Sequence, residues 1–202
     1  LLAVVSATLV AMVSPTALAT TEANTFDSED WMEGLVDVRT TDLRNTSLSS
    51  TGFSDGSLEV TIPRGTFRGL GPFDRLSEQT DEAWYRYHIQ LLDFDSDSSG
   101  KLPGLSGIYS HTGKGCYPSR AGSPGWSARG LFGAAGTHGA PAGEVPIGLY
   151  IYHLDQPRDC GESFYWPDSS LRRRRWHSSR GYVGMHGKGV GDGDVMGRLG
   201  SE

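Results

Sequence analysis

Two short pairs of polar side chains have the types and the spacing to do chemistry together. Ser127 and Arg129 lie two residues apart, and so do Tyr150 and Tyr152. Residues two apart in a strand project from the same face, about 7 Å from one another. If both strands lie in one sheet with these faces toward solvent, a guanidinium, a hydroxyl and two phenols meet in one groove. The alternative is that the tyrosines are core aromatics and Arg129 is a surface charge.

These residue types suit the recognition of a carboxylate followed by proton transfer. A guanidinium such as that of Arg129 stays charged and meets a carboxylate with two parallel hydrogen bonds. Tyr150 or Tyr152 can act as base or acid when nearby cations favour the phenolate. Lys101 supplies either that cation or a proton acceptor of its own, and Ser127 a positioning hydrogen bond. Which tyrosine has which task is left open by the sequence.

The segments that carry these residues are expected to be strands. The chain has 28 Gly and 10 Pro, which weaken helix interiors, and its apolar and aromatic residues come in short runs bounded by turn residues. The sequence therefore predicts an all-β fold, a sandwich or jelly roll. Strands are expected at 58–62, 84–92, 126–132, 148–154, 163–166 and 175–185.

The segment 84–92 gives the clearest strand pattern. Its apolar and aromatic side chains alternate with Trp84, Arg86, His88 and Gln90, which are predicted to form a solvent-facing side. Arg86, His88 and Gln90 are therefore candidates for binding substrate, and His88 and Gln90 for helping to neutralise a carboxylate. An ordinary surface role is the alternative for each.

The two ends of the chain differ in composition from its middle. Residues 1–19 are small and aliphatic and end in a small-x-small cleavage signal, which predicts a secretory signal peptide and a secreted protein; a membrane anchor is the alternative, but the apolar run is short for a bilayer. Residues 20–52, rich in Ser, Thr, Asp and Glu, are predicted to be a poorly ordered linker. Residues 53–202 are predicted to form one domain, and we expect the chain to stop before that domain is complete.

The distribution of charge and the two cysteines indicate which ligands and which covalent link to expect. Residues 1–100 hold 6 Arg and 16 acidic residues, net −10, whereas residues 101–202 hold 12 Lys or Arg and 8 acidic residues, net +4. The basic half is the better host for an anionic ligand. Nucleic acid is not expected, because no nucleic-acid motif is present. Cys116 and Cys160 can form one disulfide in an exported chain, and two unpaired thiols are the alternative.

An ordered set of motifs runs along the chain: Gly-Lys-Leu-Pro-Gly-Leu at 100–105, then Ser127-x-Arg129, then Tyr150-x-Tyr152. This set resembles polysaccharide lyase family 14, which contains alginate lyases and glucuronic-acid-specific lyases. Residues 84–94 are also similar to the family's strand before its lysine loop. The resemblance implies a β-jelly roll of concanavalin-like type with a groove on its concave sheet. It places catalytic roles on Lys101, Arg129, Tyr150 and Tyr152, and substrate binding on Ser127.

The implied reaction is β-elimination in a uronic-acid-containing polymer. The C5 proton of a uronate becomes acidic only when the neighbouring carboxylate is neutralised, and the departing O4 needs a proton. We expect no metal and no other cofactor, an acidic polysaccharide as partner, no membrane contact once the signal peptide is removed, and a monomer. The alternative function is a non-catalytic carbohydrate-binding module on the same sandwich. An aspartate run at Asp93, Asp95 and Asp97 has the wrong glycine and glutamate positions for a calcium loop.

Overall fold

The fold is described by a computed structural model. It covers residues 2–6, 23, 26, 28–33, 43–53, 56–63, 69–71, 76–77, 80–94, 97–107, 116, 125–153, 156–185 and 193–201. Within this part of the chain, no helix is long and apolar enough to cross a membrane.

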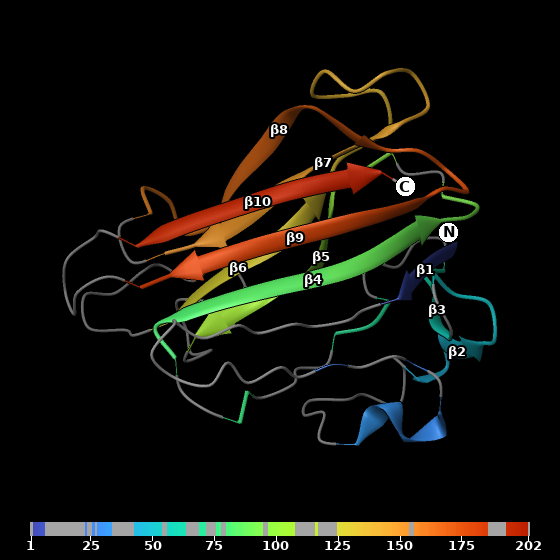
Figure 1. The fold of residues 1–202 in the computed structure, drawn as a ribbon. Coiled ribbons are helices and arrows are strands. Elements are labelled where there is room, and N and C mark those ends of the chain that lie inside the picture. The colour runs from blue at the N-terminus through green and yellow to red at the C-terminus, as the bar shows by residue number, and fades with distance from the viewer. Residues whose placement is uncertain are drawn as a thin grey trace.

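Antiparallel strands in two sheets make up almost all of the described structure. The elements are β1 (Leu2–Ser6), a 3₁₀ helix η1 (Glu29–Met32), β2 (Thr46–Ser49), β3 (Ser57–Thr61), β4 (Glu82–Leu91), β5 (Gly100–Gly107), β6 (Trp126–Phe132), β7 (Val145–Tyr152), β8 (Glu162–Leu171), β9 (Trp176–Gly184) and β10 (Asp194–Ser201). One sheet has the order β10-β9-β4-β1-β3-β2 and the other β5-β6-β7-β8. Figure 1 shows β10, β9 and β4 side by side in the front layer, with β5 to β8 behind them.

The core lies between these two layers. From β4, the alternate residues Tyr85, Tyr87, Ile89 and Leu91 are each at most 2% exposed, and they pack with residues of the opposite sheet that include Ala128 of β6 and Ile147 of β7. Burial of one side of each strand is what the two-residue period requires. The predicted all-β jelly-roll sandwich is therefore confirmed.

The structure has a strand at each predicted position and four more, β1, β2, β5 and β10. The strand predicted at 126–132 is β6 with the same bounds, and those predicted at 84–92 and 175–185 are β4 and β9. The hexapeptide motif lies on β5, so Lys101 belongs to a strand and not to a loop. Three of its six residues are Gly or Pro, which hides the strand from propensity reasoning.

Part of the predicted linker belongs to the folded domain. β2 pairs with β3, with Leu48 opposite Leu58, and Phe26 and Trp31 are buried against Leu58 and Val60 in a second, smaller cluster. The prediction of a poorly ordered linker up to residue 52 is therefore wrong for these residues. A few apolar anchors are enough to hold a segment whose other residues are polar.

The predicted signal segment is described only at its start. Residues 2–6 form β1, which pairs with β3 on one side and with β4 on the other. Residues 7–19 lie outside the described part. Cleavage before residue 20 would remove β1 from between its two neighbours, and the signal peptide stays a prediction.

Gly104 allows β5 to approach β6 closely beside the candidate site. It lies opposite Arg129, just after a register shift between Lys101 and Gly104. A Cβ atom added at Gly104 would lie on the carbonyl oxygen of Ala128 and 2.5 Å from the Cα atom of Arg129. Since backbone atoms cannot move aside as a flexible side chain can, any larger residue must push the two strands apart.

We expect Gly104→Ala to lower the free energy of unfolding by about 1–3 kcal/mol, the usual cost of forcing an extra group into a packed site. Thermal and denaturant unfolding measure the change. Gly200→Ala is the matched control, because its new Cβ atom would come no closer than 3.9 Å to the nearest atom, the carbonyl oxygen of Ser178. Equal stability of the two variants would contradict the steric account.

Candidate active site

The registers of β5, β6 and β7 bring the predicted catalytic residues to one face. Ser127 lies opposite Tyr152 and Arg129 opposite Tyr150, so the two pairs form a square on neighbouring strands. Alternate residues of the same strands, such as Ala128, enter the core. The square therefore lies on the side of the four-stranded sheet that faces away from the core.

Lys101 joins this square from β5. Its Nζ atom lies 4.4 Å from the centre of the Tyr150 ring, and the Cζ atom of Arg129 lies 6.0 Å from the same ring and 5.9 Å from that of Tyr152. The two tyrosine rings are 5.3 Å apart and nearly perpendicular, at 77°. We call Lys101, Ser127, Arg129, Tyr150 and Tyr152 the cationic tyrosine cluster.

Arg129 has hydrogen-bonding capacity that its surroundings do not use. Its Nε and Nη2 atoms are buried and have no hydrogen-bond partner among the described residues. A buried donor without an acceptor costs free energy, more so when the group is charged. Two such donors on one planar guanidinium match the two oxygens of a carboxylate.

The two phenols lie against each other and differ in acidity. Burial, the hydrogen bond to Tyr152 and the charge of Tyr152 raise the pKa of Tyr150 to about 12. Burial also raises the pKa of Tyr152, but hydrogen bonds from Tyr150 and from the amides of Cys116 and Gly161, together with the charge of Lys101, outweigh it. The pKa of Tyr152 therefore lies below its ordinary value, and Tyr152 is the more acidic of the two.

Lys101 is easier to deprotonate than an ordinary lysine. Partial burial and the nearby charge of Arg129 lower its pKa, and the charge of Tyr152 opposes them without outweighing them. The neutral amine, which is the form that accepts a proton, is therefore available at lower pH than in an ordinary lysine.

The two tyrosines differ in solvent exposure and therefore in their access to a ligand. Tyr152 is only 1% exposed, and the amide of Cys116 donates a hydrogen bond of 3.0 Å to its hydroxyl oxygen. Tyr150 is partly exposed. A ligand on this face therefore meets Tyr150 and Lys101 first, with Tyr152 behind them.

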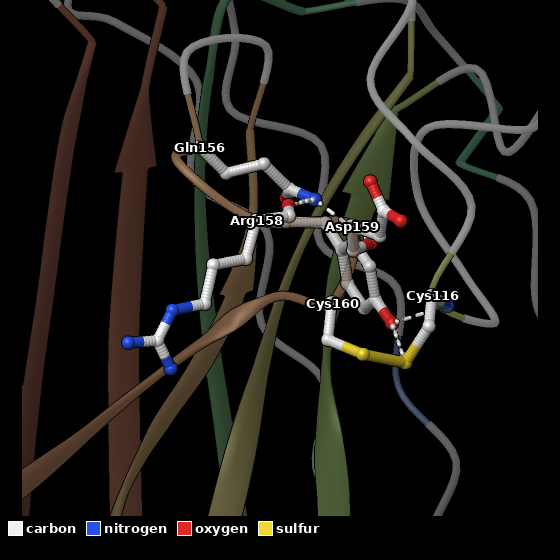
Figure 2. The surroundings of a disulfide bond; sticks show 6 residues. Cys116, Gln156, Arg158, Asp159 and Cys160 are labelled. Atoms are coloured by element: carbon white, nitrogen blue, oxygen red, sulfur yellow. Dashed lines mark hydrogen bonds between the residues drawn. A yellow bond between two sulfur atoms is a disulfide. The ribbon is translucent and has the colours of Figure 1, made fainter.

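A disulfide holds the Cys116 amide in place beside Tyr152. Cys116 is bonded to Cys160, which ends a turn after β7, and Figure 2 shows the buried Gln156 side chain reaching across that turn. Its Nε2 atom donates to the carbonyls of Arg158 and Asp159 at 2.8 and 3.1 Å. The turn thus has its own internal bracing, which fixes Cys160 and, through it, Cys116.

Sequence reasoning missed two supports of the cluster. Gly161 donates its amide to the phenols, and a Cβ atom there would lie 3.0 Å from ring atoms of both Tyr150 and Tyr152. Gln156 braces the turn as described above. A glycine beside a cysteine and a glutamine in a polar turn carry no distinctive pattern, so only the fold identifies them.

Three predicted substrate-binding residues lie elsewhere. Arg86, His88 and Gln90 are on the outer face of β4 in the six-stranded sheet, so the structure does not bring them to the cluster. The prediction that His88 is solvent-facing is wrong: it is 6% exposed because the Phe53 ring stacks on it at 3.8 Å. Phe53 arrives from the β2–β3 connection, a contact between distant segments that strand periodicity cannot reveal.

The described residues contain no group of three His, Cys, Asp or Glu side chains that could hold a metal ion. What they present instead is two cations around two phenols. This arrangement can bind an anion and move a proton.

The fold and this face together define an antiparallel β-sandwich of the jelly-roll class, with a cationic tyrosine cluster on the outside of its smaller sheet. No model of a protein family matches the sequence, and no curated protein matches it closely enough to count as a relative. Solved structures do match the fold.

The fold is similar to those of alginate lyases. A marine PL-14 alginate lyase from Aplysia kurodai matches with a TM-score of 0.64 and 20% identity, over 84% of this chain and 70% of that chain. The alginate lyase Aly36B matches with a TM-score of 0.53 and 24% identity, over 65% of this chain and 52% of that chain. A mutant of Aly36B in complex with an alginate trisaccharide matches equally well, with a TM-score of 0.54. The match thus spans about half the length of Aly36B.

Replacing both cysteines tests how the Cys116 amide affects the pKa of Tyr152. In Cys116→Ser/Cys160→Ser we expect the pKa of Tyr152 to rise, because the amide that stabilises its phenolate is no longer held in place. Nuclear magnetic resonance titration of protein labelled in its tyrosine rings measures this, with the Tyr152 signal assigned by its absence in Tyr152→Phe. A folded double variant with an unchanged Tyr152 titration would show that the disulfide does not position the amide.

Proposed function

We propose that this chain is a polysaccharide lyase that cleaves a uronic-acid-containing polymer, of alginate or glucuronan type, by β-elimination. The observation that carries the proposal is Arg129, whose two buried donors have no partner among the described residues and whose guanidinium lies about 6 Å from both tyrosine rings. The likeness of the fold to alginate lyases, one of them in complex with an alginate trisaccharide, supports the same substrate class.

Arg129 prepares the substrate by binding its carboxylate. Two charge-assisted hydrogen bonds withdraw negative charge from the carboxylate, which makes the C5 proton next to it more acidic. The bound carboxylate also satisfies the Nε and Nη2 donors of Arg129, so binding removes a cost that the free protein bears. Ser127 lies opposite Tyr152 and is fully buried, so it is given no direct contact with the substrate.

Lys101 and Tyr150 are assigned the two proton transfers. The neutral amine of Lys101 takes the C5 proton, the C4–O4 bond breaks as the C4–C5 double bond forms, and the Tyr150 hydroxyl gives its proton to O4. The proton on Lys101 then returns to the Tyr150 phenolate, which its Nζ atom faces at 4.4 Å from the ring centre. Tyr152, 1% exposed, is a positioning residue that orients the Tyr150 hydroxyl through their hydrogen bond.

Two further parts of the proposal rest on the sequence alone. Export depends on residues 1–19, which would leave residue 20 as the first of the mature protein. A monomeric state is proposed because nothing in the reaction needs a second chain.

The reaction is tested by the ultraviolet absorbance of the unsaturated product, with polymannuronate, polyguluronate and glucuronan as substrates. We expect turnover of at least one polymer, and a loss of about 10²- to 10⁴-fold in kcat for Tyr150→Phe, the usual contribution of one general acid or base. Tyr85→Phe is the matched control, since that hydroxyl is buried in the core without a hydrogen-bond partner in the described structure.

The outcome also separates the two candidate functions. Folded protein that gives no product on any of the three polymers is not a lyase of this class. If it binds a polymer equally well with and without the Tyr150 hydroxyl, it is a non-catalytic carbohydrate-binding module.

The pH profile tests the assignment of base and acid. Activity should rise as Lys101 loses its proton, below the ordinary lysine value of 10.5, and fall as Tyr150 loses its own, at about 12. The charge of Tyr152 raises the pKa of both groups, and its hydrogen bond raises that of Tyr150 as well. Tyr152→Phe removes these effects, so both limbs of the profile should move to lower pH while activity persists.

Measurement of kcat against pH for the wild type and Tyr152→Phe decides this point. If Tyr152→Phe abolishes activity at every pH, then Tyr152 itself transfers the proton and the assignment above is wrong.

A further inference from the structure

Three arginines form a row across the outer face of the six-stranded sheet. Arg86 of β4 lies opposite Arg180 of β9, and Arg180 lies opposite Arg198 of β10. Neighbouring strands are about 4.8 Å apart, so the three Cα atoms span only about 10 Å. Arg180 and Arg198 are exposed and Arg86 is partly exposed. Figure 1 shows these three strands side by side in one layer, with β5 to β8 in the layer behind them.

These three cations have no counter-charge within the described structure. No ion pair or hydrogen bond joins any of their guanidiniums to a described residue, and the Nε atom of Arg86 is buried without an acceptor. The arginines of the β8–β9 turn differ, since Arg172 pairs with Glu144 and Arg174 with Asp93. Like charges placed directly opposite one another destabilise a sheet, and no described residue offsets this cost by pairing with the row.

An aromatic row lies beside the arginine row. One step of two residues along the same strands, Trp84 lies opposite Tyr182, which lies opposite Met196. The rings of Trp84 and Tyr182 are 4.5 Å apart, and Trp84 is 43% and Met196 54% exposed. The acidic residues Glu82 and Asp194 come only after this row, about 13 Å from the arginines along the strands. The face thus offers cations next to an exposed apolar surface.

We propose that this face binds an acidic polysaccharide at a second site, separate from the cationic tyrosine cluster. Carboxylates of a chain that runs across the strands bind Arg86, Arg180 and Arg198, and the apolar side of a sugar ring stacks on Trp84. The strand spacing is close to the length of one sugar ring, so a polymer can meet each arginine in turn. The identity of the polymer, the same polyuronate that the cluster would cleave, rests on the proposed function.

The alternatives of nucleic acid and an anionic membrane fit the face less well. The chain as a whole carries a formal charge of −6, which repels an extended polyanion of high charge density outside the row itself. A membrane surface would require a broader basic patch, whereas the row spans three strands and is bounded by Glu82 and Asp194. A polyuronate has one carboxylate for each sugar ring and an apolar ring face, which matches both rows.

A second site would keep the polymer near the protein after each cleavage. The two faces belong to opposite layers of one sandwich, so the site holds a distant part of the same polymer or a second chain. Binding at one face raises the local concentration of polymer at the other without any new contact. Long polymers should benefit from this, and short oligosaccharides should not.

The test compares two triple variants of equal charge, both in the Tyr150→Phe background so that no substrate is consumed. One variant is Arg86→Gln/Arg180→Gln/Arg198→Gln, and the control is Arg172→Gln/Arg173→Gln/Arg174→Gln in the β8–β9 turn. Calorimetry with an alginate trisaccharide should give two sites per chain for the background protein and the control, and one for the first variant. The affinity of the first variant for long polymannuronate should be at least tenfold lower than that of the background protein at low salt.

Thermal unfolding shows that the first variant is folded, and it should be at least as stable as the background protein because the like charges are gone. Trp84→Ala should weaken the second site alone. The proposal is overturned if the first variant keeps both sites, if the control loses polymer affinity to the same extent, or if double-stranded DNA or phosphatidylserine vesicles bind the row as tightly as the polymer does.

These readouts are independent of turnover. If the protein cleaves no polymer but the first variant loses one binding site, the lyase proposal fails and the second site stands. If the lyase reaction is observed and both triple variants bind alike, the lyase proposal stands and the second site fails.

Discussion

The register between β6 and β7 is the constraint on which the candidate site depends. It sets Arg129 opposite Tyr150 and Ser127 opposite Tyr152, and it sends the alternate residues of both strands into the core. Because the side-chain period of a strand is two, a slip of one residue would move the guanidinium and both phenols into the core and bring Ala128 and Ile151 to the surface. Burial of the core residues therefore fixes the register, and the register fixes the chemistry.

Within that frame, each charged or polar group of the cluster depends on its neighbours. Arg129 lowers the pKa of Lys101, and Lys101 lowers that of Tyr152. Tyr152 in turn raises the pKa of Tyr150 through their hydrogen bond. The consequence is an amine that is easily deprotonated beside a phenol that keeps its proton, within a few ångströms of each other. The environment thus shifts the pKa values of the proposed base and acid in opposite directions, that of Lys101 downward and that of Tyr150 upward.

The sequence predicts the fold and most of the cluster because both depend on local periodicity. The alternation around Tyr85 and Tyr87, and the two-residue spacing in Ser127-x-Arg129, survive in the structure because each is a property of one strand. Two contacts that it could not predict join distant segments: Phe53 on His88, and the Cys116 amide on Tyr152. Sequence separation carries no information about which loop covers which face, so only the assembled sheets decide these points.

The two faces of the sandwich illustrate different uses of the same residue. In the cluster, Arg129 lies near two phenols, and its charge acts to lower the pKa of Tyr150 and that of Lys101. In the row on the other sheet, Arg86 has arginine as its cross-strand neighbour, and no group that could transfer a proton lies opposite it. A cationic row without an acid or base can bind an anion but cannot transform it. The proposed chemistry therefore rests on the smaller sheet, and the role proposed for the larger sheet is binding alone.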